Sequence, residues 1–437
     1  MHSLIWLTKQ NVPVILRSSG KGWKVRSDVW LAGRYEKEVL SSTIHGLSGV
    51  KVELDKRHIV FHRVPAWESK VEYAVEVFGE ASRLGILYYG TDNKWHIIPS
   101  GALASILIGL GAEATDIAGK RDEHWLKNKR VELGRGCRGR EYVLISTEKY
   151  AGVGKVLDAD RCVVKVKDLV VRGFKLLAEP SPGDLVELNK ATIEEAAEEA
   201  KGFIRRIYEK YVAPGKIHVS FSGGADSTAV LLLAVEELGA EKVVAAYSDT
   251  GLEYPETQEY VKKISSKLGV ELLVLEPKTA FLEEIRKRGL MSVENRWCTL
   301  LLKLYPLKKL YENRGVRLYL DGARDYESAL RARTRRIAEN PALPRVYRAL
   351  PIKSWPRLLV QLYLHSREVE LNPLYDKGLS RIGCIVCPAM HKYELALSYS
   401  LYRNLHEEII KACGFNVEEY LSMRWSGRRL FATKQTA

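Results

Sequence analysis

Residues 219–228 read Val219-Ser220-Phe221-Ser222-Gly223-Gly224-Ala225-Asp226-Ser227-Thr228. A strand runs into a glycine pair and then into an apolar helix over 229–238. Glycine lets the backbone come close to an oxyanion, and the amides at a helix start, with the Ser222 and Ser227 hydroxyls, can hold a pyrophosphate. No Gly-Lys-Ser/Thr follows, so the loop is not a Walker motif. The plainer alternative is an ordinary glycine-rich turn.

The chain after Pro214 alternates buried strands with helices. The expected strands cover 217–221, 243–247, 271–275 and 317–320. This βαβ pattern predicts an α/β fold with a parallel sheet, whose ligands bind at the carboxyl ends of the strands. The glycine pair lies at such an end.

The loop resembles the pyrophosphate loop Ser-Gly-Gly-x-Asp-Ser of the adenine-nucleotide alpha-hydrolase (PP-loop ATP pyrophosphatase) superfamily, and residues 222–227 match it fully. Within that superfamily, residues 216–425 resemble the phosphoadenosine phosphosulfate (PAPS) reductase family. The segments that carry this resemblance are Ser248-Asp249-Thr250-Gly251, Arg296-Trp297-Cys298-Thr299 with Lys303, Gly322-Ala323-Arg324 with Glu327, Pro351-Ile352 with Trp355, Asn372-Pro373-Leu374-Tyr375 and Arg381-Ile382-Gly383-Cys384.

The resemblance implies a nucleotide site. Its expected contacts are Ser220, Ser222, Gly223, Gly224, Asp226, Ser227 and Asp249, with Asp226 also catalytic and Arg324 as a phosphate or sulfate ligand. The Asp249 carboxylate can accept from ribose or adenine or hold Mg²⁺, and the Arg324 guanidinium offers a bidentate fork for an oxyanion. The alternative for Arg324 is a surface ion pair with Asp325 or Glu327.

Three cysteines lie in the same half of the chain: Cys298, and the pair Cys384 and Cys387 in a Cys-x-x-Cys spacing. We expect them to be catalytic and to bind metal. Three thiolates suit a 4Fe-4S cluster with one open iron, or a zinc ion with a fourth ligand from elsewhere, and the sequence does not choose between these. The alternative is that they are buried small hydrophobic residues.

The cysteine pattern departs from that of the adenylylsulfate reductases in the family, which hold a cluster with a Cys-Cys pair and a Cys-x-x-Cys. Here Trp297 stands where the first cysteine of the pair would be. The catalytic Glu-Cys-Gly of the reductase tail is also missing, because this tail reads Trp425-Ser426-Gly427-Arg428-Arg429. A three-cysteine cluster resembles instead that of the ATP-dependent tRNA thiolation enzymes of the same superfamily.

The remaining cysteines and three histidines are candidates of lower interest. Cys137, Cys162 and Cys413 stand alone in the sequence, and we expect them to be buried, unpaired thiols, since six cysteines in 437 residues are too few for a disulfide scaffold. His218, His365 and His391 are options for a fourth metal ligand or an acid–base group, although core or surface positions are the usual place for such residues.

The N-terminal half has a β-rich texture, with a helix expected at 100–110 capped by Ser100 and closed by Gly111. The segment Gly152-Val153-Gly154-Lys155-Val156-Leu157, with 162–168 after it, resembles part of a PUA module, a small barrel attached to RNA-modification enzymes. Residues 6–13 and 18–22 resemble the shell of a zinc ribbon whose cysteines have been replaced, with Asn11 and Pro13 retained.

Two basic runs give independent support for a polyanionic partner. Residues 120–140 contain eight basic and three acidic residues with Trp125 among them, and 324–357 contain nine basic and three acidic residues beside the expected nucleotide site. Such runs can track a phosphate backbone. Each run is also compatible with a solvated face.

The composition describes a basic globular protein. Its 437 residues allow two or three domains at roughly 150 residues each, and 46% hydrophobic residues exclude a disordered chain. The formal charge is +14. No run of about 18 apolar residues occurs, and no signal leader is visible, so we expect no membrane contact and a cytoplasmic location. Few Met and Cys beside many charged residues agree with a thermophilic source.

We divide the chain into a β-rich region at 1–80 with a degenerate zinc-ribbon-like start, a basic PUA-like module at 81–190, a linking helix at 191–213 and a PAPS reductase-like PP-loop domain at 214–437. Apolar residues at helical spacing predict the linking helix. The first functional hypothesis is an RNA, in particular tRNA, sulfur transferase. It uses ATP, Mg²⁺ and a 4Fe-4S cluster, with zinc as the alternative, and takes sulfur from a donor.

Two other hypotheses stay open. A PAPS or adenylylsulfate (sulfonucleotide) reductase in sulfate assimilation explains the family segments but not the N-terminal half. A non-catalytic RNA-binding protein with a decayed nucleotide fold explains the charge, but the intact Ser-Gly-Gly-x-Asp-Ser speaks against decay. The sequence leaves the oligomeric state open, a homodimer included.

Overall fold

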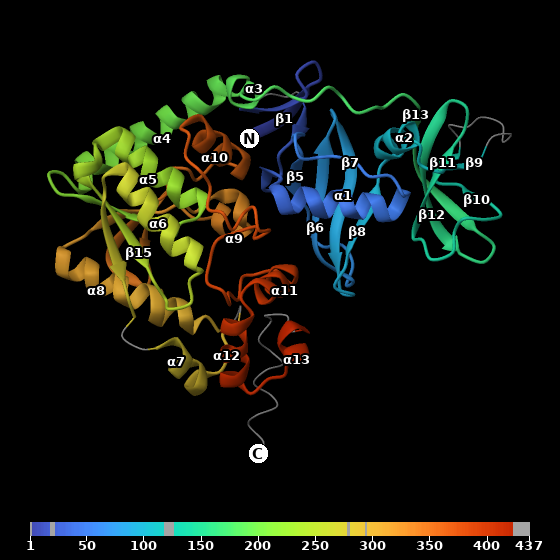
Figure 1. Ribbon diagram of the computed structural model, residues 1–437. Coiled ribbons are helices and arrows are strands. Elements are labelled where there is room, and N and C mark those ends of the chain that lie inside the picture. The colour runs from blue at the N-terminus through green and yellow to red at the C-terminus, as the bar shows by residue number, and fades with distance from the viewer. Residues whose placement is uncertain (1, 18–21, 118–125, 278–279, 293–294, 423–437) are drawn as a thin grey trace. The chain divides into compact units, whose positions relative to one another are not determined.

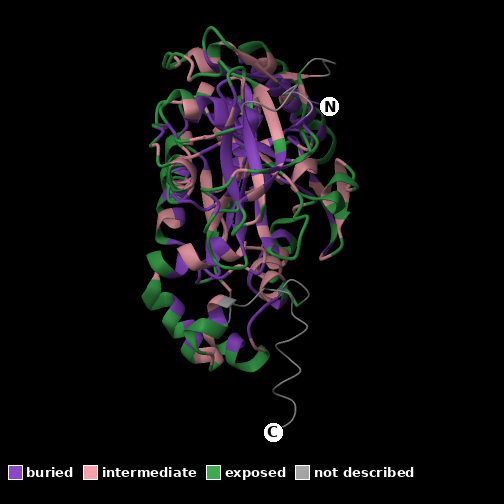
Figure 2. Ribbon diagram, turned by 90° about the vertical axis from the view of Figure 1, so that its right-hand side faces the viewer, coloured by how far each residue is buried: buried purple, intermediate pink, exposed green. Residues whose placement is uncertain are grey.

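The computed structural model describes residues 2–17, 22–117, 126–277, 280–292 and 295–422 (Figure 1). The chain forms two compact units, Met1–Asn189 and Lys190–Ala437, called here the first and second unit. Buried residues gather in the strands, and the helices carry exposed outer faces (Figure 2). Among the helices described, none is both long enough and apolar enough to cross a membrane.

The first unit contains three β-sheets in its described residues. The first has the order β2-β1-β3, from β1 (His2–Leu7), β2 (Val12–Arg17) and β3 (Trp23–Lys24). The second has the order β4-β5-β6-β7-β8, from β4 (Val29–Leu31), β5 (Val60–Arg63), β6 (Val71–Gly79), β7 (Ser82–Gly90) and β8 (Trp95–Pro99). The expected boundary between residues 80 and 81 falls in the turn between β6 and β7, which pair in this sheet.

The third sheet has the order β10-β13-β12-β11-β9, from β9 (Thr115–Asp116), β10 (Arg130–Glu132), β11 (Tyr142–Ser146), β12 (Tyr150–Asp158) and β13 (Val163–Val171). The helices are α1 (Arg34–Ser48), α2 (Gly101–Gly109) and α3 (Asp184–Glu187). The predicted cap of α2 is confirmed, because Ser100 Oγ accepts a hydrogen bond from Leu103 N at 3.1 Å. The segment resembling a PUA module forms β12 and β13, but the PUA identity itself stays a prediction.

The zinc-ribbon-like start is a hairpin held by side chains. Trp6 Nε1 donates to Asn11 Oδ1 at 2.8 Å, and Asn11 has the positive φ of 52° that a tight turn requires. Pro13 lies in β2, opposite Trp6 in β1. Residues 18–21 of the proposed shell lie outside the described residues.

One expectation about the cysteines is wrong. Cys137 and Cys162 form a disulfide, with their Cα atoms 5.1 Å apart. Both side chains are buried in the core between β10, β11 and β13, where they were expected as separate thiols. Sequence spacing could not reveal the pair, because β13 must first fold back beside β10 to bring the two residues together.

The second unit is an α/β domain with one six-stranded sheet, of order β16-β15-β14-β17-β19-β18. Its strands are β14 (Ile217–Ser220), β15 (Val243–Ser248), β16 (Glu271–Leu275), β17 (Leu318–Leu320), β18 (Ile337–Asn340) and β19 (Leu343–Ala349). All pairs are parallel except β18 with β19. The predicted parallel sheet is confirmed, and the antiparallel edge hairpin is an addition that lies in the second basic run.

The helices of the second unit are α4 (Lys190–Tyr211), α5 (Ala225–Leu238), α6 (Pro255–Leu268), α7 (Phe281–Arg288), α8 (Tyr305–Arg314), α9 (Ala329–Ala332), α10 (Arg357–Ser366), α11 (Lys392–Leu401), α12 (Arg403–Cys413) and α13 (Val417–Ser422). A π-helical turn, Thr299–Leu304, precedes α8. The expected linking helix is α4, which belongs to this unit and packs on α5 and α10.

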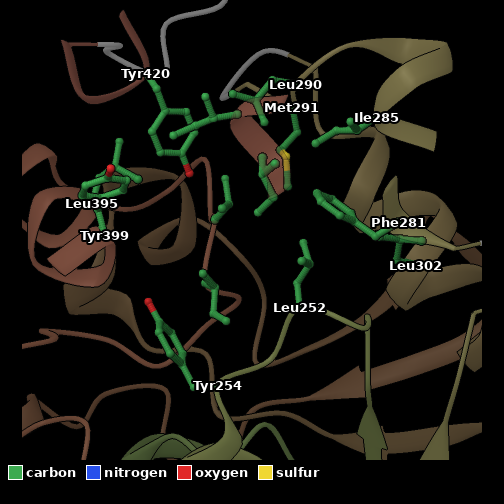
Figure 3. Close-up of a cluster of buried hydrophobic side chains, with 14 of the residues drawn as sticks. Leu252, Tyr254, Phe281, Ile285, Leu290, Met291, Leu302, Leu395, Tyr399 and Tyr420 are labelled. Atoms are coloured by element: carbon green, nitrogen blue, oxygen red, sulfur yellow. The ribbon is translucent and has the colours of Figure 1, made fainter. Parts of the chain in front are cut away.

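An apolar cluster joins the C-terminal helices to the loop after β15. It contains Leu252, Tyr254, Phe281, Leu395 and Tyr420, and Figure 3 shows their side chains converging from separate segments. Cys298 and Cys384 pack against its edge. Burial of this apolar surface therefore fixes the place of the cysteines next to the sheet.

Candidate functional site

The phosphate loop lies between β14 and α5. Gly223 has a φ of +73°, and a Cβ added there would lie 3.0 Å from Thr257 Cγ2, so a larger residue would be strained and crowded. Ser222 N donates to Ser227 Oγ at 3.2 Å, and the hydroxyls of Ser222 and Ser227 are also 3.2 Å apart. Gly224 is the N-cap of α5. The loop therefore brings two hydroxyls to the start of a helix, the place where oxyanions bind.

Two residues from beyond β19 support this loop. Asn372 Nδ2 donates to Gly223 O at 3.3 Å, and the Tyr375 hydroxyl accepts from Ala225 N at 3.0 Å. The hydroxyl of Tyr375 thus lies beside the first amide of α5. Burial raises the pKa of Tyr375, which keeps it a neutral hydroxyl.

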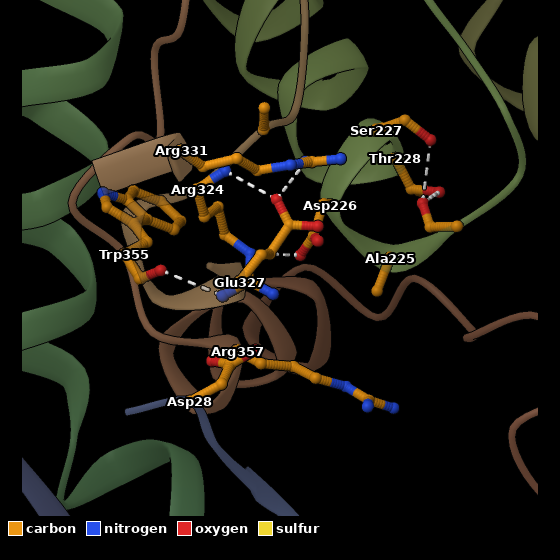
Figure 4. A network of polar contacts seen from close by, with 12 residues as sticks. Asp28, Ala225, Asp226, Ser227, Thr228, Arg324, Glu327, Arg331, Trp355 and Arg357 are labelled. Atoms are coloured by element: carbon orange, nitrogen blue, oxygen red, sulfur yellow. Dashed lines mark hydrogen bonds and ion pairs between the residues drawn. The ribbon is translucent and has the colours of Figure 1, made fainter. Parts of the chain in front are cut away.

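Arg324 is attached to the loop by an ion pair. Its Nε lies 2.8 Å from Asp226 Oδ1, and its side chain is only 3% exposed (Figure 4). Arg324 Nη1 also donates to Trp355 O at 3.2 Å. Gly322 makes the approach possible, because a Cβ there would lie 2.9 Å from the Asp226 carbonyl carbon. The partner is therefore Asp226 of the phosphate loop, a contact that links β17 to the start of α5.

Asp249 follows β15, the strand beside β14. Its Oδ1 accepts from Gly251 N at 2.9 Å and its Oδ2 accepts from Gln258 Nε2 at 2.8 Å, so the carboxylate is held in place. A cavity of about 440 Å³ opens here, lined by Asp249, Gly251, Glu276 and the α12 residue Leu405 among others. Its size is that of a small-ligand pocket, at the strand ends where α/β sheets bind ligands.

The three cysteines converge beside Glu253. Cys384 pairs with Glu253 in an isolated antiparallel bridge, and Cys384 Sγ donates to Glu253 Oε1 at 3.3 Å. Thr250 Oγ1 donates to the same oxygen at 2.9 Å, and Lys303 Nζ lies 3.7 Å from it. One buried carboxylate thus gathers a thiol, a hydroxyl and an ammonium group.

Burial favours the protonated thiol at two of the three cysteines, Cys298 and Cys384. Burial and then the charge of Glu253 raise the pKa of Cys384 to about 12. Burial raises the pKa of Cys298, and Cys387 adds to the shift at both other cysteines, so the three lie near one another. Burial lowers the pKa of Lys303, but the Glu253 carboxylate 3.7 Å from its Nζ favours the charged ammonium, and the pKa is raised overall. In this arrangement Lys303 is the charged group, and the thiols of Cys298 and Cys384 are neutral.

The cysteines do not form a ready metal site. Among the described ranges of the chain, no group of three or more His, Cys, Asp or Glu side chains is placed to hold a metal ion. The thiol of Cys384 is directed to Glu253 instead. His218 is buried in β14 with its ring 5.4 Å from that of Tyr311, which is a core position. The predicted 4Fe-4S cluster therefore stays a prediction, without geometric support.

Sequence reasoning assigned no role to two residues of this site. Glu253 contacts Cys384, Thr250 and Lys303. The sequence feature that could have identified it is an acidic residue just after the end of a strand. Tyr247, near the end of β15, has a buried hydroxyl without a hydrogen-bond partner in the described residues, close to Glu253 and Asp249. A tyrosine within a buried strand reads as core, so only the fold reveals that it faces the site.

The basic runs have distinct environments. Arg336 is not a surface charge, because it donates to Pro351 O at 3.0 Å, lies 3.4 Å from Glu199 Oε1 and covers the ring of Phe203. Arg333 and Arg335 are exposed. In the first run, Trp125 lies outside the described residues.

Some known proteins resemble most of the chain, and others resemble only its second unit. Residues 216–390 match the phosphoadenosine phosphosulfate reductase domain. The uncharacterised protein MJ0066 of Methanocaldococcus jannaschii is 30% identical over 90% of this chain and 88% of its own length. Adenosine 5'-phosphosulfate reductase 1 of Bacillus subtilis is 27% identical over 32% of this chain and 60% of its own length. The PAPS reductase of Candida auris, in its phosphate complex, shares 20% identity over 45% of this chain and 95% of its own, with a TM-score of 0.36.

Proposed function

The chain belongs to the family of MJ0066 and carries a PAPS reductase domain, and from this premise we propose that it is an ATP-dependent RNA sulfur transferase. The domain and its sulfonucleotide reductase relatives make the chain an enzyme. The proposal goes further in naming ATP, a sulfur species and RNA, in particular tRNA.

One observation carries the proposal, namely the complete Ser-Gly-Gly-x-Asp-Ser loop at the start of α5. The facing hydroxyls of Ser222 and Ser227 can donate to the oxygens of a pyrophosphate that leaves when ATP adenylates a nucleobase oxygen. Arg324 and Asp226 lie at the same helix start. The cavity beside Asp249 then receives the adenosine, with Gly251 allowing close approach.

The cysteines supply the second half of the proposal. In the proposed step, one of Cys298, Cys384 and Cys387 carries a persulfide received from a sulfur donor, and the outer sulfur attacks the adenylated carbon, so that the C–O bond breaks and AMP leaves. A second of these cysteines then attacks the sulfur of the first, which releases the thiolated base and leaves a disulfide between the two cysteines, and an external thiol reduces that disulfide. Lys303 lies within reach of Cys384 and can stabilise a thiolate when a ligand displaces Glu253. No step is assigned to an iron–sulfur cluster or to zinc, because the described side chains do not form a metal site.

RNA is proposed as the acceptor on the basis of charge and of the first unit. The formal charge of +14, the exposed Arg333 and Arg335, and the PUA-like segment agree with a polyanionic substrate.

A sulfonucleotide reductase is the second candidate, and the domain match favours it. Trp297 in place of a cysteine speaks against it. The two candidates differ in the bond they break, since a sulfur transferase releases pyrophosphate from ATP and a reductase releases sulfite from a sulfonucleotide.

The test is an assay of both products with the full chain purified without oxygen. Pyrophosphate released from ATP only when RNA is present, with sulfur incorporated into that RNA, supports the transferase. Sulfite released from adenylylsulfate or PAPS in the presence of a thiol, without pyrophosphate, overturns it in favour of the reductase.

Metal analysis of the same preparation decides the role of the cysteines. Iron and sulfide that disappear in Cys384→Ala, but persist in Cys413→Ala, would establish the 4Fe-4S prediction against the geometry described above. One zinc ion without iron would make the three cysteines structural, and a metal-free chain that transfers sulfur would leave the thiols themselves as the carriers.

A further inference from the structure

The first unit contains a cavity that the proposed reaction does not use. It measures about 630 Å³ and lies between α1, β8 and the loop that leads into β11. The contacts of α1 place it against β8 and β11, and Figure 1 shows the helix crossing in front of the strands of the second sheet. The volume is that of a small-ligand pocket.

One face of α1 supplies the first wall. The helix buries Leu40 and Ile44, and it turns Tyr35, Glu38 and Ser42 to the cavity at helical spacing. Glu38 and Ser42 are exposed. This wall therefore offers a carboxylate and a hydroxyl, which are acceptors for the ring and amino N–H groups of a nucleobase.

Aromatic side chains of β8 form the second wall, and their neighbours hold them rigid. The Trp95 ring lies 5.3 Å from that of Tyr89 and 6.1 Å from that of Tyr73, both edge-on. Trp95 also hydrogen-bonds to Tyr35 across the cavity. A fixed indole is a stacking platform that loses little entropy when a base lies against it.

A second group of aromatic rings lies on the opposite face of this sheet. The ring of His96 stacks on Tyr88 at 5.0 Å, held by Asp92 at 2.9 Å. Trp67 lies edge-on to Tyr88 at 5.7 Å and is 41% exposed, which is unusual for an indole. Neighbouring residues of a strand point to opposite faces of a sheet, so these rings lie on the other side of the edge strand β8 from Trp95, where a single strand of RNA that passes round this edge would reach them.

Arg140 is the cation available at the rim. Lys70 and Lys155 lie 3.5 and 3.8 Å from Glu141, whereas the exposed Arg140 enters no ion pair with the described residues. The Cys137–Cys162 disulfide and a turn from Arg140 N to Cys137 O fix the loop that carries it. A guanidinium at this rim can bind a phosphate.

We propose that this cavity binds one nucleotide of single-stranded RNA, with its base beside Trp95, its N–H edge toward Glu38 and its phosphate at Arg140. A second base stacks on Trp67. The choice of RNA as the strand rests on the proposed function. Alternating aromatic platforms and cations are the means by which proteins hold single strands, and every base has a face for stacking.

The test is the affinity of the full chain for a labelled single-stranded RNA hexamer, measured by fluorescence anisotropy over a series of salt concentrations. Arg140→Ala should weaken binding about fivefold and lower the salt slope by about 0.7 units, the value for one phosphate contact of a single strand. Arg138→Ala is the matched control, because it removes the same charge from the same loop at a residue that pairs only weakly, at 3.6 Å, with Asp160. Its affinity should stay within twofold of the unaltered chain.

The variant Trp67→Ala distinguishes binding of a single strand of RNA from binding of a free nucleotide. It should weaken the hexamer about tenfold while leaving the affinity for a nucleoside monophosphate unchanged. Equal losses in Arg138→Ala and Arg140→Ala would overturn the proposal in favour of a diffuse basic surface. Tight binding of the monophosphate with none of the hexamer would overturn it in favour of a small-molecule site.

The outcomes are independent of the catalytic proposal. An Asp226→Asn chain that has lost pyrophosphate release should still bind the hexamer with its original affinity. Loss of hexamer binding only in the Arg140 and Trp67 variants supports the cavity even if no sulfur transfer is found. If the chain releases pyrophosphate but the Arg140 and Trp67 variants bind the hexamer as the unaltered chain does, the cavity proposal is wrong and the catalytic proposal stands.

Discussion

Arg324 Nε lies 2.8 Å from Asp226 Oδ1, and this contact joins a nearly fully buried guanidinium to the first turn of α5. The Asp226 side chain is 27% exposed, so one face of the carboxylate remains accessible to a ligand. The pair therefore has two roles that can be separated by experiment. It neutralises a buried charge in the fold, and it orients two groups where a phosphate is expected.

Replacing Asp226 with Ala should lower the free energy of unfolding by about 3 kcal/mol, because it removes the carboxylate that faces the buried Arg324 guanidinium. Pyrophosphate release should be abolished at the same time, with RNA affinity nearly unchanged. Urea denaturation, a pyrophosphate assay and RNA titration measure the three effects. Equal loss of activity and RNA affinity would refute the prediction that RNA binding does not depend on the phosphate loop.

A double variant, Asp226→Ala with Arg324→Met, should recover most of the lost stability but none of the activity. Asp325→Ala is the control for a more exposed ion pair, since it removes the partner of Lys353, whose side chain is 15% exposed against 3% for Arg324. It should cost at most about 1 kcal/mol. A double variant as unstable as the single one would show that the cost arises from the loop and not from the buried charge.

Features that depend on residues close together in the sequence could be predicted from the sequence. The order strand, glycine pair and helix at 219–238 is contiguous, so the phosphate loop and the parallel sheet could be inferred from the order of residues alone. The partner of Arg324 could not, because Asp226 becomes its neighbour only when β17 pairs with β14. The same holds for Cys137 with Cys162, and for Glu253 as the common partner of Cys384 and Lys303.

The structure also changes the test of the second basic run. Arg336 packs on the ring of Phe203 and stabilises the fold. The test of RNA binding is therefore limited to Arg333 and Arg335, which are exposed. Changing both to Ala should lower the salt slope of RNA binding by about 1.4 units if each contacts one phosphate of a single strand. Unfolding stability should be unaltered, and Arg336→Ala should show the reverse pattern. An unchanged slope in the double variant would assign the run to a solvated face.

The disulfide predicts a redox-dependent stability of the first unit. Reduction, or the double change Cys137→Ser with Cys162→Ser, should lower its free energy of unfolding by about 3 kcal/mol, because the bond closes a loop between residues 25 apart in sequence. Cys413→Ser, outside the bond, is the control and should respond to reductant as the unaltered chain does. Mass spectrometry after alkylation without reductant checks the bond directly, since finding all six thiols alkylated in the folded protein would exclude it.

The buried imidazole of His218 predicts a pH dependence of stability in the second unit. Burial, with a further contribution from Arg314, lowers its pKa to about 4 from the ordinary 6.5. Between these values the unfolded chain binds a proton that the folded chain does not, so stability rises as the pH increases from about 4 to 6.5 and is fully present above 6.5. The difference corresponds to about 3 kcal/mol over the window.

His218→Phe removes this proton while keeping an aromatic ring against Tyr311. We measure the free energy of unfolding in urea at several pH values. Between pH 4 and 6.5 this free energy should depend on pH less steeply in the variant than in the unaltered chain, because the contribution of His218 is gone. Tyr311→Phe is the matched control, because it alters the same contact without a group that titrates in acid, and its slope should equal that of the unaltered chain. An equal slope in all three proteins would show that the pKa of His218 is not lowered in the folded chain.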